Sequence, residues 1–198
     1  MGKQILPTED RLIVHGVKME KQIRRAALLF DGLVIVACGL LLAWFSAIIA
    51  PAAGFTIGEI IISGDAVIGG LFSFAYLFAI GMTGRYGAAT VACLEQLVIL
   101  LCAVPSLKII QILLLLSGGL SADLLMKMIR HRVCCARCSL AVGAVSAALS
   151  GLSIVYGGIN ILIAVLSGGL GGLVAYTAAG RIRTWGAREA IYNEAETK

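Results

Sequence analysis

The sequence predicts an all-α integral membrane protein: a single bundle of six transmembrane helices with the N- and C-termini in the cytoplasm. Two observations support this prediction. The 198 residues are 60% hydrophobic with a mean hydropathy of +0.98, well above the values of soluble domains. Fifteen of the sixteen Lys and Arg residues fall on one side of the membrane when the apolar runs are threaded in alternation, and an excess of loop cations marks the cytoplasmic side.

Six apolar runs account for most of the chain. Each is about 17–25 residues long, which at about 1.5 Å per residue is enough to cross a hydrocarbon core of about 30 Å. They cover residues 26–50, 66–82, 88–104, 109–126, 140–156 and 159–179. The predicted organisation is a cytosolic N-terminal arm at 1–25, a transmembrane domain at 26–180 and a cytosolic C-terminal tail at 181–198.

Short segments connect the runs. Residues 51–65 form the longest external loop, whose apolar centre is too short to span and lies over the bundle or dips into it. Gly84 and Gly87 flank a tight cytosolic turn around Arg85, and Pro105 breaks the chain at the external surface. Lys108 follows that break and is the one basic residue predicted outside.

Small residues recur at helical spacing in the last two runs. Gly143, Ala147 and Gly151 are four residues apart in the fifth run, and Gly168 and Gly172 are four apart in the sixth. Such stripes let membrane helices approach closely. They indicate either packing within the bundle or docking to another subunit.

The cysteines are predicted to be reduced thiols, because none lies in an external loop. Three lie in the runs and three in the cytosolic loop after the fourth run: Cys38, Cys93, Cys102, Cys134, Cys135 and Cys138. On a helix, His131 and the loop cysteines would offer a metal two ligands but not a tetrahedral set of four. We expect no metal and no cofactor.

Several function classes are disfavoured. The net charge of +5 is explained by the cytosolic bias of the basic residues, so it does not indicate nucleic-acid binding. Both histidines, His15 and His131, are predicted to be cytosolic, so no Ser/His pair can form within the spans. The chain has no GxxxxGK[ST] phosphate loop, so it does not hydrolyse ATP itself. We expect a protein that is not an enzyme.

Two acidic residues in the runs invite different interpretations. Asp123 can pair with Lys127 one turn later, as a structural ion pair. Glu95 lies ten residues after Arg85, roughly 15 Å along the helix and close to the membrane midplane. A buried glutamate is costly unless it is protonated, paired or met by a cation. Ligand or partner binding, hydrogen bonding between helices and a proton relay are the alternatives for it.

Polar and aromatic residues at the external side are the candidates for a binding cavity open to the outside. An acidic, aromatic-lined pocket suits a cationic or amine-bearing small molecule. Taken singly, each residue also fits a role in satisfying a neighbouring helix end. The substrate-binding candidates are Glu95, Glu59, Asp65, Tyr76, Gln111, Tyr156 and Asn160.

Residues 84–130 carry a resemblance to a known family. The stretch contains Arg85-Tyr86-Gly87-Ala88-Ala89, the intramembrane Glu95, Val104-Pro105-Ser106 and Gly118-Gly119-Leu120-Ser121-Ala122-Asp123-Leu124, and it ends in basic residues. It resembles the substrate-binding S components of energy-coupling factor (ECF) vitamin transporters, most nearly the YkoE-like thiamine or hydroxymethylpyrimidine group. Tyr86 stands where that group has a proline.

The resemblance implies a membrane subunit that captures a vitamin-like molecule, such as thiamine or its hydroxymethylpyrimidine precursor. Its partners would be an ECF transmembrane coupling protein, cytosolic ATPase subunits and membrane lipid. Ala43 and Ala47 would form the small-residue docking face on the first span, and residues 51–65 would cover the site. Glu95 and one of Glu59 or Asp65 would neutralise the cation. A tyrosine, Tyr76 or Tyr156, would stack on the ligand, and a side-chain amide, Gln111 or Asn160, would orient it.

Two other classes remain. The first is a non-catalytic structural subunit of a multi-subunit membrane complex that has no ligand of its own. The second is a small secondary transporter or channel, which is disfavoured because the sequence shows no inverted halves.

Overall fold

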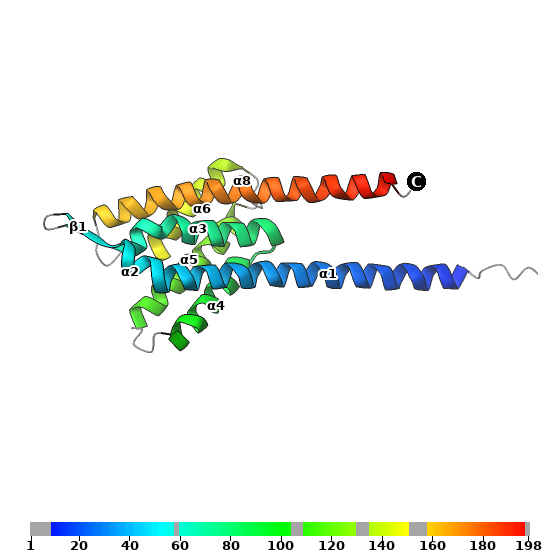
Figure 1. Ribbon diagram of the computed structural model, residues 1–198, viewed down its shortest axis with the longest axis horizontal. Coiled ribbons are helices and arrows are strands. Elements are labelled where there is room, and N and C mark those ends of the chain that lie inside the picture. The colour runs from blue at the N-terminus through cyan, green and yellow to red at the C-terminus, as the bar shows by residue number, and fades with distance from the viewer. Residues whose placement is uncertain (1–8, 58–59, 104–108, 130–134, 151–157, 197–198) are drawn as a thin grey trace, which may run out of the picture. The chain divides into compact units, whose positions relative to one another are not determined.

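The computed structural model describes residues 9–57, 60–103, 109–129, 135–150 and 158–196 (Figure 1). The chain divides into two units, Met1–Leu33 and Val34–Lys198. Glu59, Lys108, His131, Cys134, Gly151 and Tyr156 lie outside the described residues. The first unit contains the beginning of the first helix, and the pocket and the side-chain contacts described below lie in the second unit.

Helices dominate the described residues. They are α1 (Glu9–Trp44), the π-helical segment η1 (Phe45–Ile49), α2 (Ala50–Ala53), α3 (Gly64–Thr83), α4 (Ala88–Ala103), α5 (Ile109–Met128), α6 (Ala136–Ser150) and α8 (Ile159–Glu196). Two short strands, β1 (Phe55–Ile57) and β2 (Ile60–Ile62), lie between α2 and α3. The helices include residues of both predicted extramembrane segments, since α1 begins at Glu9 and α8 continues to Glu196.

Among the described residues, four helical stretches are long and apolar enough to cross a membrane: Arg25–Ile49, Gly64–Thr83, Ile109–Met128 and Ile159–Thr184. Two further apolar helices are shorter, Ala88–Ala103 and Ala136–Leu149. A helical fold with the character of a membrane protein is therefore supported. Each of the six predicted apolar runs corresponds to one of these helical stretches, four of which have the length of a span.

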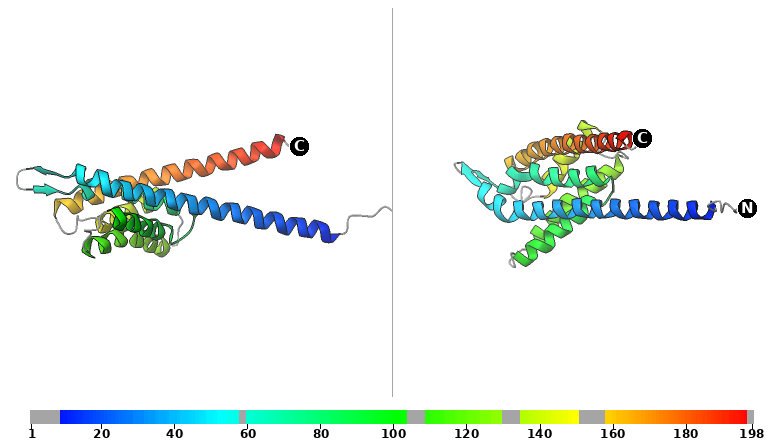
Figure 2. Two further views of the ribbon diagram at one scale, coloured as in Figure 1. Left: turned by 60° about the horizontal axis from the view of Figure 1, so that its bottom comes forward. Right: turned by 45° about the vertical axis from the view of Figure 1, so that its right-hand side comes forward.

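Glycines allow α3, α6 and α8 to pack backbone against backbone (Figures 1 and 2). A Cβ added at Gly171 would overlap the carbonyl of Gly70 in α3, and one added at Gly143 would overlap the carbonyl of Gly168. A Cβ at Gly172 would overlap the Ser139 carbonyl of α6. The small-residue stripes of the fifth and sixth runs are thus packing faces within the bundle, one of the two roles expected for them.

Large apolar side chains fill the space between α1, α3, α4 and α5. Leu42, Phe72, Tyr76, Leu77 and Met126 are almost completely buried in one core cluster. Many leucines and valines on the outer faces are instead exposed. In a bilayer this is the expected arrangement, because lipid replaces water around the bundle and apolar side chains can face outward.

Both ends of α3 are capped. At its start the Ser63 hydroxyl accepts a hydrogen bond from the Ala66 N–H (3.3 Å), the usual role of an N-cap serine. At its end Gly84 adopts a left-handed conformation (φ 65°) and its N–H donates to the Ile80 carbonyl (2.8 Å), as in common helix C-caps. Arg183 of α8 also donates to the Gly81 carbonyl, where a cation complements the helix dipole.

The loop predicted at 51–65 contains regular structure. Strands β1 and β2 pair in antiparallel register, with Phe55 opposite Ile62 and Thr56 opposite Ile61. Ile62 and Ser63 are buried, whereas Phe55 and Ile61 are exposed. The segment is therefore a β-hairpin in which Ile62, next to α3, is buried, whereas the sequence predicted only an external loop with an apolar centre.

Candidate functional site

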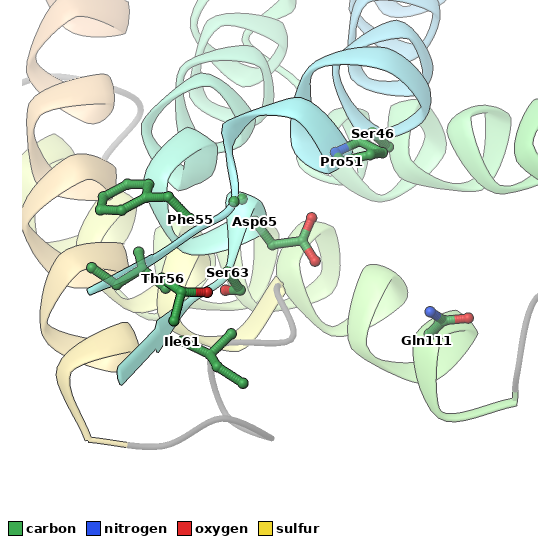
Figure 3. A pocket seen from close by; sticks show the side chains of 11 residues that line it. Ser46, Pro51, Phe55, Thr56, Ile61, Ser63, Asp65 and Gln111 are labelled. Atoms are coloured by element: carbon green, nitrogen blue, oxygen red, sulfur yellow. The ribbon is translucent and has the colours of Figure 1, made fainter. Parts of the chain in front are cut away.

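A pocket of about 400 Å³ opens beside the hairpin (Figure 3). Its wall comes from the end of the first span, the hairpin, the first turn of α3 and the first turn of α5. The lining residues are Ser46, Pro51, Gly54, Phe55, Thr56, Ile61, Ile62, Ser63, Gly64, Asp65 and Gln111. Segments about 65 residues apart in sequence thus meet at one end of the bundle, the end that the basic-residue pattern assigns to the exterior.

Of the predicted site residues that the structure describes, Asp65 and Gln111 line this pocket. Asp65 lies in the first turn of α3, where the helix dipole favours a negative charge. Figure 3 shows its carboxylate pointing toward the side of the pocket formed by α5, from which Gln111 rises. A carboxylate has about four acceptor positions, so it can serve a ligand in addition to protein donors.

Asn160, another predicted site residue, holds the hairpin in place. It is 2% exposed at the start of α8. Its Oδ1 accepts from the Ser63 N–H (2.8 Å), and its Nδ2 donates to the Ile61 carbonyl (2.9 Å). Both ends of the side-chain amide are thereby engaged with the end of β2 and the N-cap of α3. Asn160 does not line the pocket but positions two residues that do.

Tyr76 is also absent from the pocket lining. Its ring is buried in the core, and its hydroxyl donates to the Cys93 sulfur (3.8 Å). Cys93 in turn donates to the Leu115 carbonyl (2.9 Å). This chain of contacts joins α3, α4 and α5, so Tyr76 packs between helices at this position, away from the pocket wall.

Glu95 lies on the α1-facing side of α4 and does not line the pocket. Its carboxylate lies against the backbone of Gly39 in α1: a Cβ built on Gly39 would lie 2.5 Å from Glu95 Oε2. No hydrogen bond or ion pair to Glu95 occurs within the described residues. Glu95 is thus half-buried at a contact between α1 and α4, whereas the sequence predicted that it lines the binding cavity.

Gln96, which sequence reasoning did not select, connects α4 to the pocket wall. It is fully buried, and its Nε2 donates to Ser46 Oγ (2.6 Å) and to the Leu42 carbonyl (3.4 Å). Ser46 belongs to η1, whose wider turn shifts the helix face just before the pocket. π-Helical turns are rare and occur frequently at functional sites. The only available sequence signal was an uncharged amide inside an apolar run.

The predicted docking pair Ala43 and Ala47 does not form one face. Ala43 is 3% exposed and packs inside the bundle, whereas Ala47 is exposed. In a regular α-helix residues four apart share a face. The π-helical segment that begins at Phe45 breaks this relation, so an AxxxA surface cannot be read directly from the sequence here.

Asp123 makes a different contact from the ion pair expected with Lys127. Its Oδ2 accepts from the Thr90 N–H (2.7 Å) and the Thr90 hydroxyl (2.6 Å). Thr90 is the third residue of α4, so a carboxylate on α5 caps the N-terminus of a neighbouring helix. The expected ion pair with Lys127 was therefore wrong. The i to i+4 spacing considers only neighbours on the same helix, whereas the donors to Asp123 belong to α4.

Metal-binding residues do not gather in the part of the chain that the structure describes. No group of three His, Cys, Asp or Glu residues there could hold a metal ion. Cys38 and Cys93 are buried free thiols, and Cys102 is an exposed one.

No protein-family model, curated protein or solved structure matches this chain.

Proposed function

We propose that this chain is a six-span membrane protein with cytoplasmic termini that binds a small cationic or amine-bearing molecule at its external end. The class we propose is the substrate-binding subunit of an ECF-type importer for a vitamin-like molecule such as thiamine or its hydroxymethylpyrimidine precursor. The observation that supports this proposal is the pocket that contains Asp65, Gln111 and Ser46.

The pocket has the size and chemistry of a small-molecule site. Its volume of about 400 Å³ falls within the range of about 300–1,000 Å³ for such sites. It combines a carboxylate at Asp65, an amide at Gln111 and a hydroxyl at Ser46 with apolar side chains of the hairpin, so polar and apolar surfaces are mixed in its wall. Polar groups in a pocket wall orient a ligand, and the carboxylate favours a positively charged one.

Uptake would need partners, because the sequence has no nucleotide-binding loop. In the proposed assembly, an ECF coupling protein and cytosolic ATPases supply the energy and this chain supplies the recognition. The proposal rests on the resemblance of residues 84–130 and on the position of the pocket at the predicted external end.

Direct binding tests the proposal. Purified protein carrying Trp185→Phe, which leaves Trp44 as its single tryptophan beside η1, is titrated with thiamine and with hydroxymethylpyrimidine. We expect saturable quenching for at least one of them, and weaker binding at 1 M salt than at 0.1 M because charge attraction is screened. No response to either, confirmed by calorimetry on the unsubstituted protein, would favour the structural-subunit alternative.

Topology requires its own test. Single cysteines introduced at Thr56 and Tyr86 in a cysteine-free background report the two faces through a membrane-impermeant maleimide. We expect labelling at position 56 in intact cells, and at position 86 only after permeabilisation. Labelling of both positions in intact cells would contradict the proposed threading, and with it the external location of the pocket.

A further inference from the structure

Ser46 is the one pocket-lining residue that is hydrogen-bonded to Gln96. The bond joins α4 to η1 at a distance of 2.6 Å between Gln96 Nε2 and Ser46 Oγ. The same Nε2 also lies 3.4 Å from the Leu42 carbonyl oxygen. One buried amide group therefore holds two consecutive turns of the first span.

The backbone carbonyl of Leu42 determines which end of the Gln96 side-chain amide faces the first span. A backbone carbonyl can only accept a hydrogen bond, so the Gln96 atom that faces it must be the NH₂ group. With the opposite assignment, two acceptor oxygens would face each other. The NH₂ group is therefore the end of Gln96 that also meets Ser46.

The direction of this bond determines what Ser46 can offer. A serine hydroxyl has one proton and two lone pairs. Because Gln96 donates, Ser46 Oγ accepts, and its own proton is left for another acceptor. Within the described residues Ser46 makes no other hydrogen bond, so this proton is available to the pocket that Ser46 lines.

Burial of Gln96 has a free-energy cost, so its presence is not explained by a gain in stability. Its Oε1 is buried and has no hydrogen-bond partner among the described residues. An unpaired buried acceptor costs about 1–3 kcal/mol, and such groups need a specific explanation. An apolar residue at position 96 would avoid this cost but would leave Ser46 without its donor.

We propose that Gln96 is a positioning residue that turns Ser46 into a hydrogen-bond donor toward the pocket, and that the ligand meets it with an acceptor atom. Asp65 on another part of the wall meets a cationic or N–H group. The pocket then selects molecules that combine a positive or N–H donor group with a lone-pair acceptor, such as a ring nitrogen or a hydroxyl oxygen. This inference rests on the proposed function of the same pocket and narrows its substrate class.

A double-mutant cycle tests the proposal with thiamine and hydroxymethylpyrimidine as probes. We expect Ser46→Ala to weaken binding about tenfold, as for the loss of one hydrogen bond of about 1.4 kcal/mol. Gln96→Met should weaken binding by a similar factor, and the double variant by no more than either single one, because Gln96 acts through Ser46. Ser46→Thr, which keeps the hydroxyl, should retain most of the affinity.

Additive losses in the double variant would show that Gln96 acts independently of Ser46 and would overturn the proposal. An unchanged affinity in Ser46→Ala would overturn it as well. Thermal unfolding of each variant in detergent confirms that binding is compared among folded proteins.

A second measurement needs no ligand and so separates this inference from the proposed function. Hydrogen exchange followed by mass spectrometry should show faster exchange over residues 45–49 in Gln96→Met, and unchanged exchange over residues 164–175 of α8. Equal exchange over 45–49 in the two proteins would contradict the positioning role, whether or not any probe binds. Failure of all probes to bind, with faster exchange over 45–49, would instead refute the proposed ligand while supporting the role of Gln96.

Discussion

Glu95 of α4 packs its carboxylate directly against the backbone of Gly39 in α1. A Cβ built on Gly39 would lie 2.5 Å from Glu95 Oε2 and 3.0 Å from the Ala92 carbonyl oxygen. A methyl group at position 39 would therefore have to displace the Glu95 carboxylate and would press against the Ala92 carbonyl. The acidic residue that the sequence placed near the membrane midplane belongs to this contact between α1 and α4.

Gly39→Ala is expected to destabilise the protein by about 1–3 kcal/mol, the usual cost of overpacking a close contact. Thermal unfolding in detergent measures the effect. Gly180→Ala is the matched control, because a Cβ at Gly180 meets nothing within 4 Å and an alanine in α8 favours the helix. Adding Glu95→Ala to Gly39→Ala should recover part of the stability; no recovery would mean that the Ala92 carbonyl alone sets the limit.

Asp65→Asn should weaken binding of a cationic probe such as thiamine at least tenfold, about 1.4 kcal/mol, because it removes the pocket's carboxylate. Glu95→Gln is the comparison and should change affinity less than twofold, since Glu95 does not line the pocket. Calorimetry on both variants distinguishes the two acids. A larger loss of affinity in Glu95→Gln than in Asp65→Asn would indicate that Glu95, and not Asp65, binds the cation.

Asn160→Leu removes both bonds that hold the hairpin and leaves the Ser63 N–H and the Ile61 carbonyl without this partner. Faster hydrogen exchange over residues 60–64 and weaker probe binding are expected. Asn160→Asp keeps the acceptor for Ser63 but loses the donor to Ile61, so it should fall between the wild type and Asn160→Leu. If the two variants behaved alike, the donor to Ile61 would be the bond that matters.

Asp123→Ala should destabilise the protein by about 1–2 kcal/mol, because it removes the cap from the N-terminus of α4. Thr90→Val removes only the hydroxyl bond and keeps the backbone N–H that donates to Asp123. It should therefore cost less than Asp123→Ala in thermal unfolding. An equal loss would assign the stabilisation to the hydroxyl, not to the cap.

The positions of the helices follow from the sequence because long apolar runs can be satisfied in a membrane only by internally hydrogen-bonded structure. The run expected at 66–82 corresponds to α3, and the run at 109–126 begins with α5 at Ile109. The helix ends were less predictable. Arg183 lies in α8, where a cytosolic tail had been expected, because polar residues can continue a helix after it leaves the apolar region.

The site was harder to predict, because its residues meet through long-range contacts. Asn160 and Ser63 are far apart in the sequence, and no local pattern indicates that the Asn160 side chain accepts a hydrogen bond from the Ser63 N–H. The π-helical segment at Phe45 changes the helix face locally, which invalidated the spacing argument for Ala43 and Ala47. The hairpin did carry a signal: two apolar stretches flank Gly58-Glu59, a spacing compatible with a two-residue turn.

The glycine contacts of α3, α6 and α8 also determine how this protein can move. Where Gly171 meets the Gly70 carbonyl and Gly143 meets that of Gly168, a shift of α8 by one residue would bring Leu170 or Leu173 into a space that holds no side chain. These contacts therefore fix the register of the three helices relative to one another. The residues that α3 contributes to the pocket, Gly64 and Asp65, are carried by this packed set, whereas η1 and the start of α5 contribute Ser46 and Gln111 from outside it.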